Sequence, residues 1–110
     1  MSASANSYYF AKTAAERERQ DKKFGEQNTG RSLTRYLSII TEEFGEGVRE
    51  INGLLEEMEQ WAIQEDGALT EEQYTRVKLY FDRAETEMVE TMACILLLLT
   101  NMRAGTYRLA

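Results

Sequence analysis

The sequence predicts an all-α protein, and three observations support this fold class. The 110 residues include no proline, whereas β-rich domains use proline in many of their turns. Apolar residues recur at intervals of three and four over a long middle segment, which is the period of one helix face. A second long segment begins with a helix-capping pattern and precedes a glycine that can end it. The length allows one domain, which we place at residues 8–110, after a flexible lead-in at residues 1–7.

The composition excludes several classes of function. The chain has no histidine, which excludes histidine-ligated zinc, catalytic triads and di-iron bundles built on Glu-x-x-His. Its one cysteine, Cys94, excludes a disulfide framework. The net charge of −6 argues against a nucleic-acid partner, and acids alternate with bases in the one basic run, residues 17–23. The longest apolar stretch, residues 91–100, is shorter than the roughly 20 residues of a membrane span. We therefore expect a cytoplasmic protein with no membrane partner.

The first helix is predicted over residues 8–25. It carries a dense run of mixed charges at residues 16–23, whose simplest interpretation is a solvated helix face. Residues 27–30 read Gln-Asn-Thr-Gly, which is the composition of a loop. The chain is thus expected to turn there before a longer helix begins.

Two long helices are predicted after this loop. The second helix spans residues 32–64, and its apolar positions form one continuous stripe: Leu33, Tyr36, Leu37, Ile40, Phe44, Val48, Ile51, Leu55, Met58 and Ala62. Residues 65–67 break it. Thr70, followed by Gln73, forms a capping box that opens the third helix. That helix is expected to last until Arg103, with Gly105 as its stop.

The second half of the third helix is apolar on every side. Residues 92–99 read Met-Ala-Cys-Ile-Leu-Leu-Leu-Leu, and a helix that is apolar all round is buried all round. Two helices of about 30 residues are each roughly 45 Å long, so one chain of this size cannot cover them. We therefore expect an antiparallel helical bundle that is completed by homo-oligomerisation.

Two pairs of glutamates do not fit a solvated helix face. Glu43 and Glu46 border the apolar stripe of the second helix, and Glu87 and Glu90 immediately precede the all-apolar run of the third. Carboxylates half-buried together need a counter-charge, and an all-oxygen cage suits Mg²⁺ or Mn²⁺ better than zinc. Gly47, on the buried side, would allow the two helices to approach closely. The alternative is that these are ordinary surface glutamates.

The residues around both pairs resemble a known family. Residues 40–46, Ile-Thr-Glu-Glu-Phe-Gly-Glu, followed by Val48, are similar to the first signature of the MazG-type all-α nucleoside triphosphate pyrophosphohydrolases. Residues 87–93, Glu-Met-Val-Glu-Thr-Met-Ala, are similar to the second, in which the family has Glu-x-x-Asp before an apolar run. The charged run at residues 16–28 resembles the first-helix region of short, often phage-borne, members. The resemblance covers about residues 14–103 and departs from the family at Glu90, where Asp is usual.

This resemblance implies a helical homodimer or dimer of dimers that hydrolyses a (deoxy)nucleoside triphosphate to the monophosphate and pyrophosphate. It implies that Mg²⁺, or Mn²⁺ in its place, is held by four catalytic residues, Glu43, Glu46, Glu87 and Glu90. Such chemistry needs no histidine, because a divalent cation neutralises phosphate and lowers the pKa of an attacking water. The preferred base and sugar stay open, as does the choice between dimer and tetramer.

The resemblance also suggests residues that bind the substrate. Lys22 and Lys23 are candidates for phosphate contact, Phe24 and Asn28 for base stacking and base-edge hydrogen bonding, and Tyr36 for lining the same pocket. Core packing is the alternative role for the two aromatic residues, and a solvated face is the alternative for the lysines. For the whole protein, the alternative is a non-catalytic helical interaction module that retains the bundle. The longer carboxylate in the second signature favours this alternative.

Overall fold

A computed structural model describes residues 3–61 and 67–109 of the chain. The described residues form three α-helices and one 3-10 helix: α1 (Ala3–Phe24), η1 (Gly25–Asn28), α2 (Leu33–Met58) and α3 (Glu71–Ala104). They contain no β-strand beyond an isolated bridge between Ser32 and Arg108. The predicted all-α class is confirmed.

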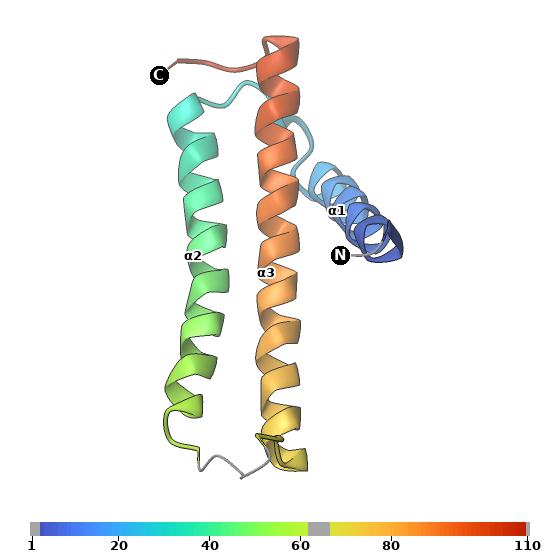
Figure 1. Cartoon of the computed structure of the whole chain (residues 1–110). Coiled ribbons are helices and arrows are strands. Elements are labelled where there is room, and N and C mark those ends of the chain that lie inside the picture. The colour runs from blue at the N-terminus through green and yellow to red at the C-terminus, as the bar shows by residue number, and fades with distance from the viewer. Residues whose placement is uncertain (1–2, 62–66, 110) are drawn as a thin grey trace.

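The two long helices form an antiparallel pair, and the first helix lies beside it. In Figure 1, α2 and α3 run side by side along the length of the molecule, while α1 packs on α3 at an angle to both. The molecule measures 57 × 30 × 22 Å, and its radius of gyration is 17.8 Å. A compact chain of this length would have a radius of gyration of about 13 Å. The fold is therefore elongated and has little interior.

The first helix begins earlier than predicted. It starts at Ala3 rather than at residue 8, so residues 3–7 of the expected lead-in are helical; residues 1 and 2 lie outside the described residues. Alanine is the best helix former, and serine and asparagine are tolerated near a helix start. This segment can therefore extend the helix. The helix ends at Phe24, before Gly25, whose φ of 54° lies in the left-handed region.

Helices α2 and α3 begin as the sequence predicts. Ser32 caps α2 by accepting a hydrogen bond from the Arg35 amide, and Thr70 and Gln73 form the predicted capping box of α3. Gly105, with a φ of 72°, caps the end of α3. Helix α2 ends at Met58, several residues before the predicted position. Its last turn tightens into hydrogen bonds between residues three apart, and residues 62–66 lie outside the described residues.

The junction of η1, α2 and α3 is tied together by buried polar groups. The Tyr36 hydroxyl and the Asn101 side-chain amide both donate to the Asn28 carbonyl, at 3.1 and 2.9 Å. Tyr36 is only 2% exposed. The C-terminal segment also pairs with the start of α2, since the Leu33 amide donates to the Arg108 carbonyl at 2.9 Å. These contacts fix the position of the loop before α2 against the end of α3.

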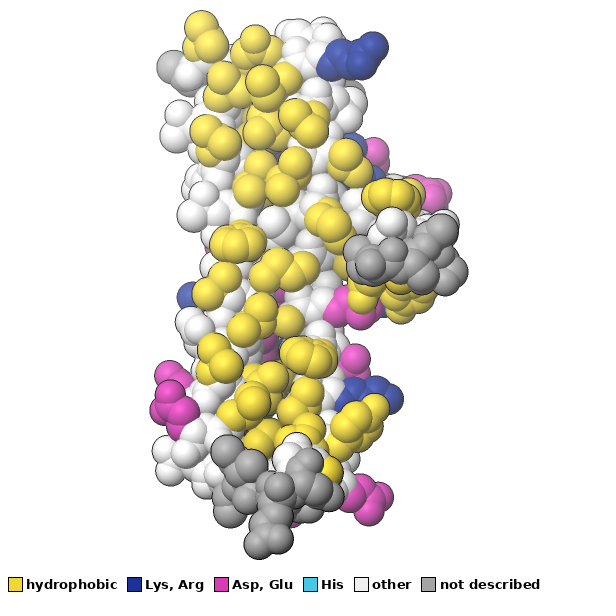
Figure 2. All heavy atoms as spheres, viewed as in Figure 1, with side chains coloured by type: hydrophobic (Ala, Val, Ile, Leu, Met, Phe, Trp, Pro, Cys, Tyr) yellow, Lys and Arg dark blue, Asp and Glu magenta, His cyan; other side chains and the backbone are white. Residues whose placement is uncertain are grey.

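Much of the apolar stripe on α2 faces away from α3. Of its predicted stripe, Tyr36 is buried, but five members are at least two-fifths exposed: Leu37, Phe44, Ile51, Leu55 and Met58. Helix α3 adds further exposed apolar side chains: Tyr74, Leu79, Phe81, Met92, Ile95, Leu96, Leu99 and Met102. Figure 2 shows hydrophobic side chains gathered along the visible face of the hairpin from one end to the other.

We call this exposed surface of α2 and α3 the apolar face. Within one chain the stripe of α2 is only partly buried, because α2 has one long neighbour and can bury one side only. None of the helices in the described part of the chain combines the length and the apolar character that a membrane span requires. The core of the chain is the narrow seam between α2 and α3, with α1 against α3.

Candidate metal centre

Four glutamates converge between α2 and α3. One carboxylate oxygen from each lies within 4.8 Å of those of the others, and all four side chains are half-buried. We call this set the glutamate cluster: Glu43 and Glu46 from α2, and Glu87 and Glu90 from α3. Each pair is spaced three residues apart and so occupies one helix face. The structure thus brings together the four residues that the sequence singled out as candidate ligands.

A glycine explains how the two helices come close enough. Gly47 is buried in the seam, and a Cβ atom built there would lie 2.5 Å from Met88 Cε and 3.4 Å from Glu87 Cβ. Any larger residue would therefore displace α3 or its side chains. Gly45, one residue beyond Phe44, has no atom within 4 Å of such a Cβ. The predicted role of Gly47 in close helix approach is confirmed, and Gly45 has no such role.

The electrostatics of the glutamate cluster are unfavourable without a counter-ion. Burial, a hydrogen bond with Glu90 and the neighbouring negative charges raise the pKa of Glu43 to about 8. Burial, a hydrogen bond with Glu46 and the same crowding raise the pKa of Glu87 to about 7. The Oε2 atoms of Glu43 and Glu87 are buried and have no hydrogen-bond partner among the described residues. Such buried acceptors are costly, so a positive charge or a further donor at the centre of the cluster would stabilise it.

These properties fit a hard divalent cation. Carboxylate oxygens are the ligands that such cations prefer, and the two unpartnered oxygens provide free acceptor positions. Ordinary surface glutamates point into water, whereas these four side chains are half-buried and face one another. The glutamate cluster could therefore hold a metal ion.

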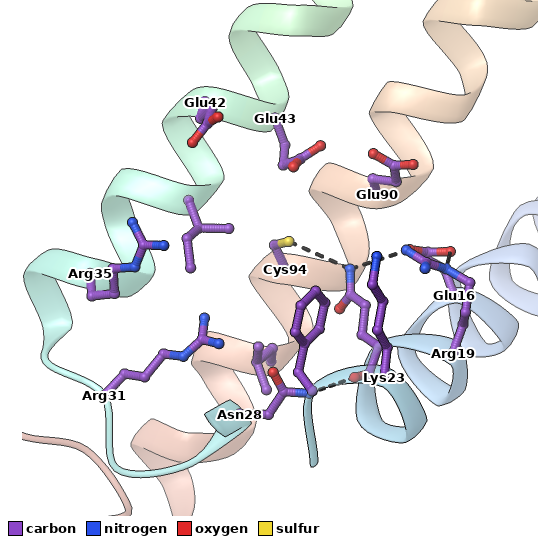
Figure 3. Close-up of a pocket in the computed structure, with 14 residues that line it drawn as sticks. Glu16, Arg19, Lys23, Asn28, Arg31, Arg35, Glu42, Glu43, Glu90 and Cys94 are labelled. Atoms are coloured by element: carbon purple, nitrogen blue, oxygen red, sulfur yellow. Dashed lines mark hydrogen bonds and ion pairs between the residues drawn. The ribbon is translucent and has the colours of Figure 1, made fainter. Parts of the chain in front are cut away.

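A cavity of about 310 Å³ opens beside the glutamate cluster. Figure 3 shows Glu43 and Glu90 facing each other at one end, with Arg31 and Arg35 reaching in from the start of α2. All three helices and the loop before α2 contribute to its wall. Four basic and four acidic side chains line it: Arg19, Lys23, Arg31, Arg35, Glu16, Glu42, Glu43 and Glu90. In a protein with a net charge of −6, this place thus carries as many basic side chains as acidic ones.

Three of the five predicted substrate-binding residues line this cavity. Lys23 and Phe24 do so at the end of α1, with the Lys23 ammonium 5.3 Å from the centre of the Phe24 ring. Asn28 also lines it, but its side-chain amide donates to the Gln20 carbonyl and to Asp21. Because both of its N–H groups can be used in this way, Asn28 serves mainly to hold η1 against α1.

The other two predicted residues lie elsewhere. Lys22 is exposed and pairs with Glu18 at 3.3 Å, as expected for a solvated helix face. The Tyr36 ring is buried in the junction, and its hydroxyl is bonded to the Asn28 carbonyl. Neither residue lines the cavity. Their alternative roles, a solvated face for Lys22 and core packing for Tyr36, describe the structure better.

Sequence reasoning missed the arginines of this cavity. Arg19 is held by Glu16, which accepts from its Nε at 2.8 Å, and that hydrogen bond, with smaller contributions from Glu90 and Glu43, raises the pKa of Arg19. Arg31 and Arg35 flank the start of α2, whose first turn contains no acid. A helix N-terminus favours negative charge, so two arginines at this position were a signal in the sequence that could have indicated an anion site.

Comparison with protein-family models, with curated proteins and with solved structures gives no significant match.

Proposed function

We propose that this protein is a divalent-metal-dependent hydrolase that converts a (deoxy)nucleoside triphosphate to the monophosphate and pyrophosphate. The observation that carries the proposal is the glutamate cluster, in which four half-buried carboxylates from two helices meet within 4.8 Å and two oxygens are unpartnered. A cavity lined by four basic and four acidic side chains adjoins it. This combination suits a substrate that brings both a metal and a polyphosphate. The likeness of residues 40–46 and 87–93 to the MazG-type signatures supports the same reaction.

In this proposal the glutamate cluster ligates Mg²⁺, with Mn²⁺ as a substitute. The cation, when bound, supplies charge neutralisation for the phosphates and lowers the pKa of a water. The chain's own contribution is to hold the four carboxylates on two rigid helices, at a distance that the close approach at Gly47 sets. Phe24 at the cavity wall offers a face for stacking of the base, and Lys23 a cation for the phosphates.

The proposal includes self-association of a cytoplasmic protein into a homodimer or a dimer of dimers, which completes the helical bundle. The apolar face supports this part, because an extended exposed apolar surface marks an interaction site. The elongated shape, with a radius of gyration of 17.8 Å, also supports it. The alternative, a non-catalytic helical interaction module, would use the same apolar face without turnover at the glutamate cluster.

The direct test is a panel of ribo- and deoxyribonucleoside triphosphates, incubated with Mg²⁺ or Mn²⁺ and analysed for pyrophosphate and monophosphate. We expect at least one nucleotide to give both products in equal amounts, and chelation by EDTA to stop the reaction. Glu43→Gln removes a ligand charge and should reduce turnover by about a hundredfold or more, while circular dichroism shows unchanged helicity.

Glu56→Gln, an equal charge change at an exposed position of α2, is the matched control and should keep wild-type turnover. Full activity of Glu43→Gln would show that the glutamate cluster takes no part in the reaction. A well-folded protein that forms no product from any nucleotide would leave only the interaction module.

A further inference from the structure

Two arginines flank the start of α2, and the first turn of this helix contains no acid. Ser32 caps the helix, and its first turn contains no Asp or Glu. Arg31 precedes this cap, and Arg35 lies one turn beyond it. The unpaired amides of a helix N-terminus already carry a partial positive charge. Two arginines at this position repel that charge, and a sequence selected only for helix stability would place acids there.

Arg31 and Arg35, which we call the arginine pair, line two neighbouring hollows. The first is the cavity that contains Glu43 and Glu90. The second has a volume of about 390 Å³ and is lined, among the described residues, by Thr29, Gly30, Arg31, Ser32, Arg35 and Arg108. Three of these six residues are arginines and none is acidic. The arginine pair therefore lies between the cavity that contains two carboxylates of the glutamate cluster and a second hollow that contains only basic and neutral residues.

The loop that carries the arginine pair is held in place by the C-terminal segment. The Arg108 amide donates to the Arg31 carbonyl at 3.0 Å, and Arg108 Nε donates to the Gly30 carbonyl at 2.8 Å. These bonds fix the backbone before α2. The Arg35 guanidinium, in contrast, forms no hydrogen bond or ion pair with the residues that the structure describes. A cation that faces a cavity on a fixed backbone is well placed for an anionic ligand.

We propose that the arginine pair binds the phosphate chain of a polyphosphate ligand, in an anion subsite that adjoins the glutamate cluster. This inference rests on the proposed function and deepens it, by assigning the phosphate contacts chiefly to the start of α2 rather than to Lys22. Arg35 and Glu43 are eight residues apart on α2, or about 12 Å along the helix axis. An arginine side chain together with a triphosphate can span this separation. The planar guanidinium also matches two phosphate oxygens at once, as lysine cannot.

The test uses inorganic tripolyphosphate as a probe that has no base or sugar, titrated calorimetrically into the full-length protein with Mg²⁺ present. We expect Arg35→Gln to weaken binding by about tenfold or more, as the loss of a charged hydrogen bond does. Arg31→Gln should have a similar effect, and Arg35→Lys should restore part of it. Lys78→Gln, with the same charge change on the exposed first half of α3, is the matched control and should bind as wild type does.

Binding of Mn²⁺ alone should be unchanged in Arg35→Gln, because that residue is not in the glutamate cluster. Tripolyphosphate affinity that is unaltered in both arginine variants, or absent in the wild type, would overturn the subsite. If the wild type hydrolyses nucleotides while the arginine variants keep its KM, the subsite alone fails. If tripolyphosphate binding depends on Arg35 but no nucleotide is hydrolysed, the subsite stands and the proposed function fails.

Discussion

Each side of the α2–α3 hairpin departs from the usual polarity in one respect. Toward the seam, this pair of helices half-buries four carboxylates of like charge. Toward solvent, it exposes Leu37, Phe44 and Leu55, each more than half exposed. Globular proteins ordinarily bury such apolar residues and expose glutamates. Under our proposal, the seam is organised around a polar site at a cost in stability, and the outer side is organised for a partner.

If the apolar face serves self-association, a charge placed on it should have the largest effect. Leu99 on α3 is 52% exposed, so Leu99→Glu leaves the seam intact but places a charge where a second copy would pack. We expect the mass measured by light scattering to fall by half or more, with helicity retained at low temperature. Thr100→Glu adds the same charge at the neighbouring exposed position and should disturb association less. Equal masses for wild type and Leu99→Glu would exclude this part of the face as an interface.

The seam itself can be tested at its point of closest approach. Gly47→Val places a side chain against Met88 and Glu87, and we expect it to destabilise the fold by about 1–3 kcal/mol. It should also weaken Mn²⁺ binding, because the added side chain crowds Glu87, a member of the glutamate cluster. Gly45→Ala is the matched control, since a Cβ there meets nothing within 4 Å, and it should stabilise the helix by about 0.5–1 kcal/mol. Denaturation by urea and calorimetric titration of Mn²⁺ measure both effects.

If Gly47→Val has the same free energy of unfolding and the same Mn²⁺ affinity as the wild type, the role assigned to that glycine is contradicted. The opposite signs expected at Gly45 and Gly47 are informative, since both glycines carry the same helix-propensity penalty. The two positions differ in their distance to α3, and the larger side chain is placed at the closer one.

Helical periodicity and capping residues were enough to predict most of the fold. Thr70, Gln73 and Gly105 set the bounds of α3 through local hydrogen bonds and backbone conformation, which act within a few residues and are therefore visible in a sequence. The start at Ala3 was not predicted, because small polar residues suit both a helix end and an irregular segment. The early end of α2 at Met58 was missed for a related reason, since the apolar period continues beyond it.

The candidate site was only partly predictable. The glutamate cluster was found because three-residue spacing on two helices places each pair on one face. The position of α1 relative to the other helices cannot be derived from the spacing of apolar residues. Lys22 was therefore predicted to contact phosphate together with Lys23, although Lys22 pairs with Glu18 on the same helix. Tyr36 was assigned to the pocket because its burial in the junction depends on Asn28, at the end of η1, and on Asn101, which is distant from it in sequence.

The smallest effect we expect is on the pH dependence of stability, and it compares two glutamates with opposite surroundings. The pKa of Glu87, raised to about 7 mainly by burial, lies above its ordinary value of 4.5, so the folded protein retains a proton that the unfolded chain releases. The metal-free protein should therefore lose stability as the pH rises from about 4.5 to about 7, and Glu43 should extend this loss to about pH 8. Thermal unfolding between pH 5 and pH 8.5, in the presence of EDTA, measures this slope.

Glu57 supplies the contrast at the far end of the hairpin. The hydrogen bond from Arg76 lowers the pKa of Glu57, so its contribution to stability is present above its ordinary pKa and is lost only in acid. Glu87→Gln should therefore flatten the decline in melting temperature toward pH 8, whereas Glu57→Gln should lower the melting temperature there. Mn²⁺ should stabilise the wild type more at pH 8 than at pH 5.5, because the cation competes with the bound protons. A wild-type melting temperature that rises steadily with pH in the absence of metal would mean that the four carboxylates are not crowded in solution. A cation would then no longer be needed to explain why the seam half-buries them.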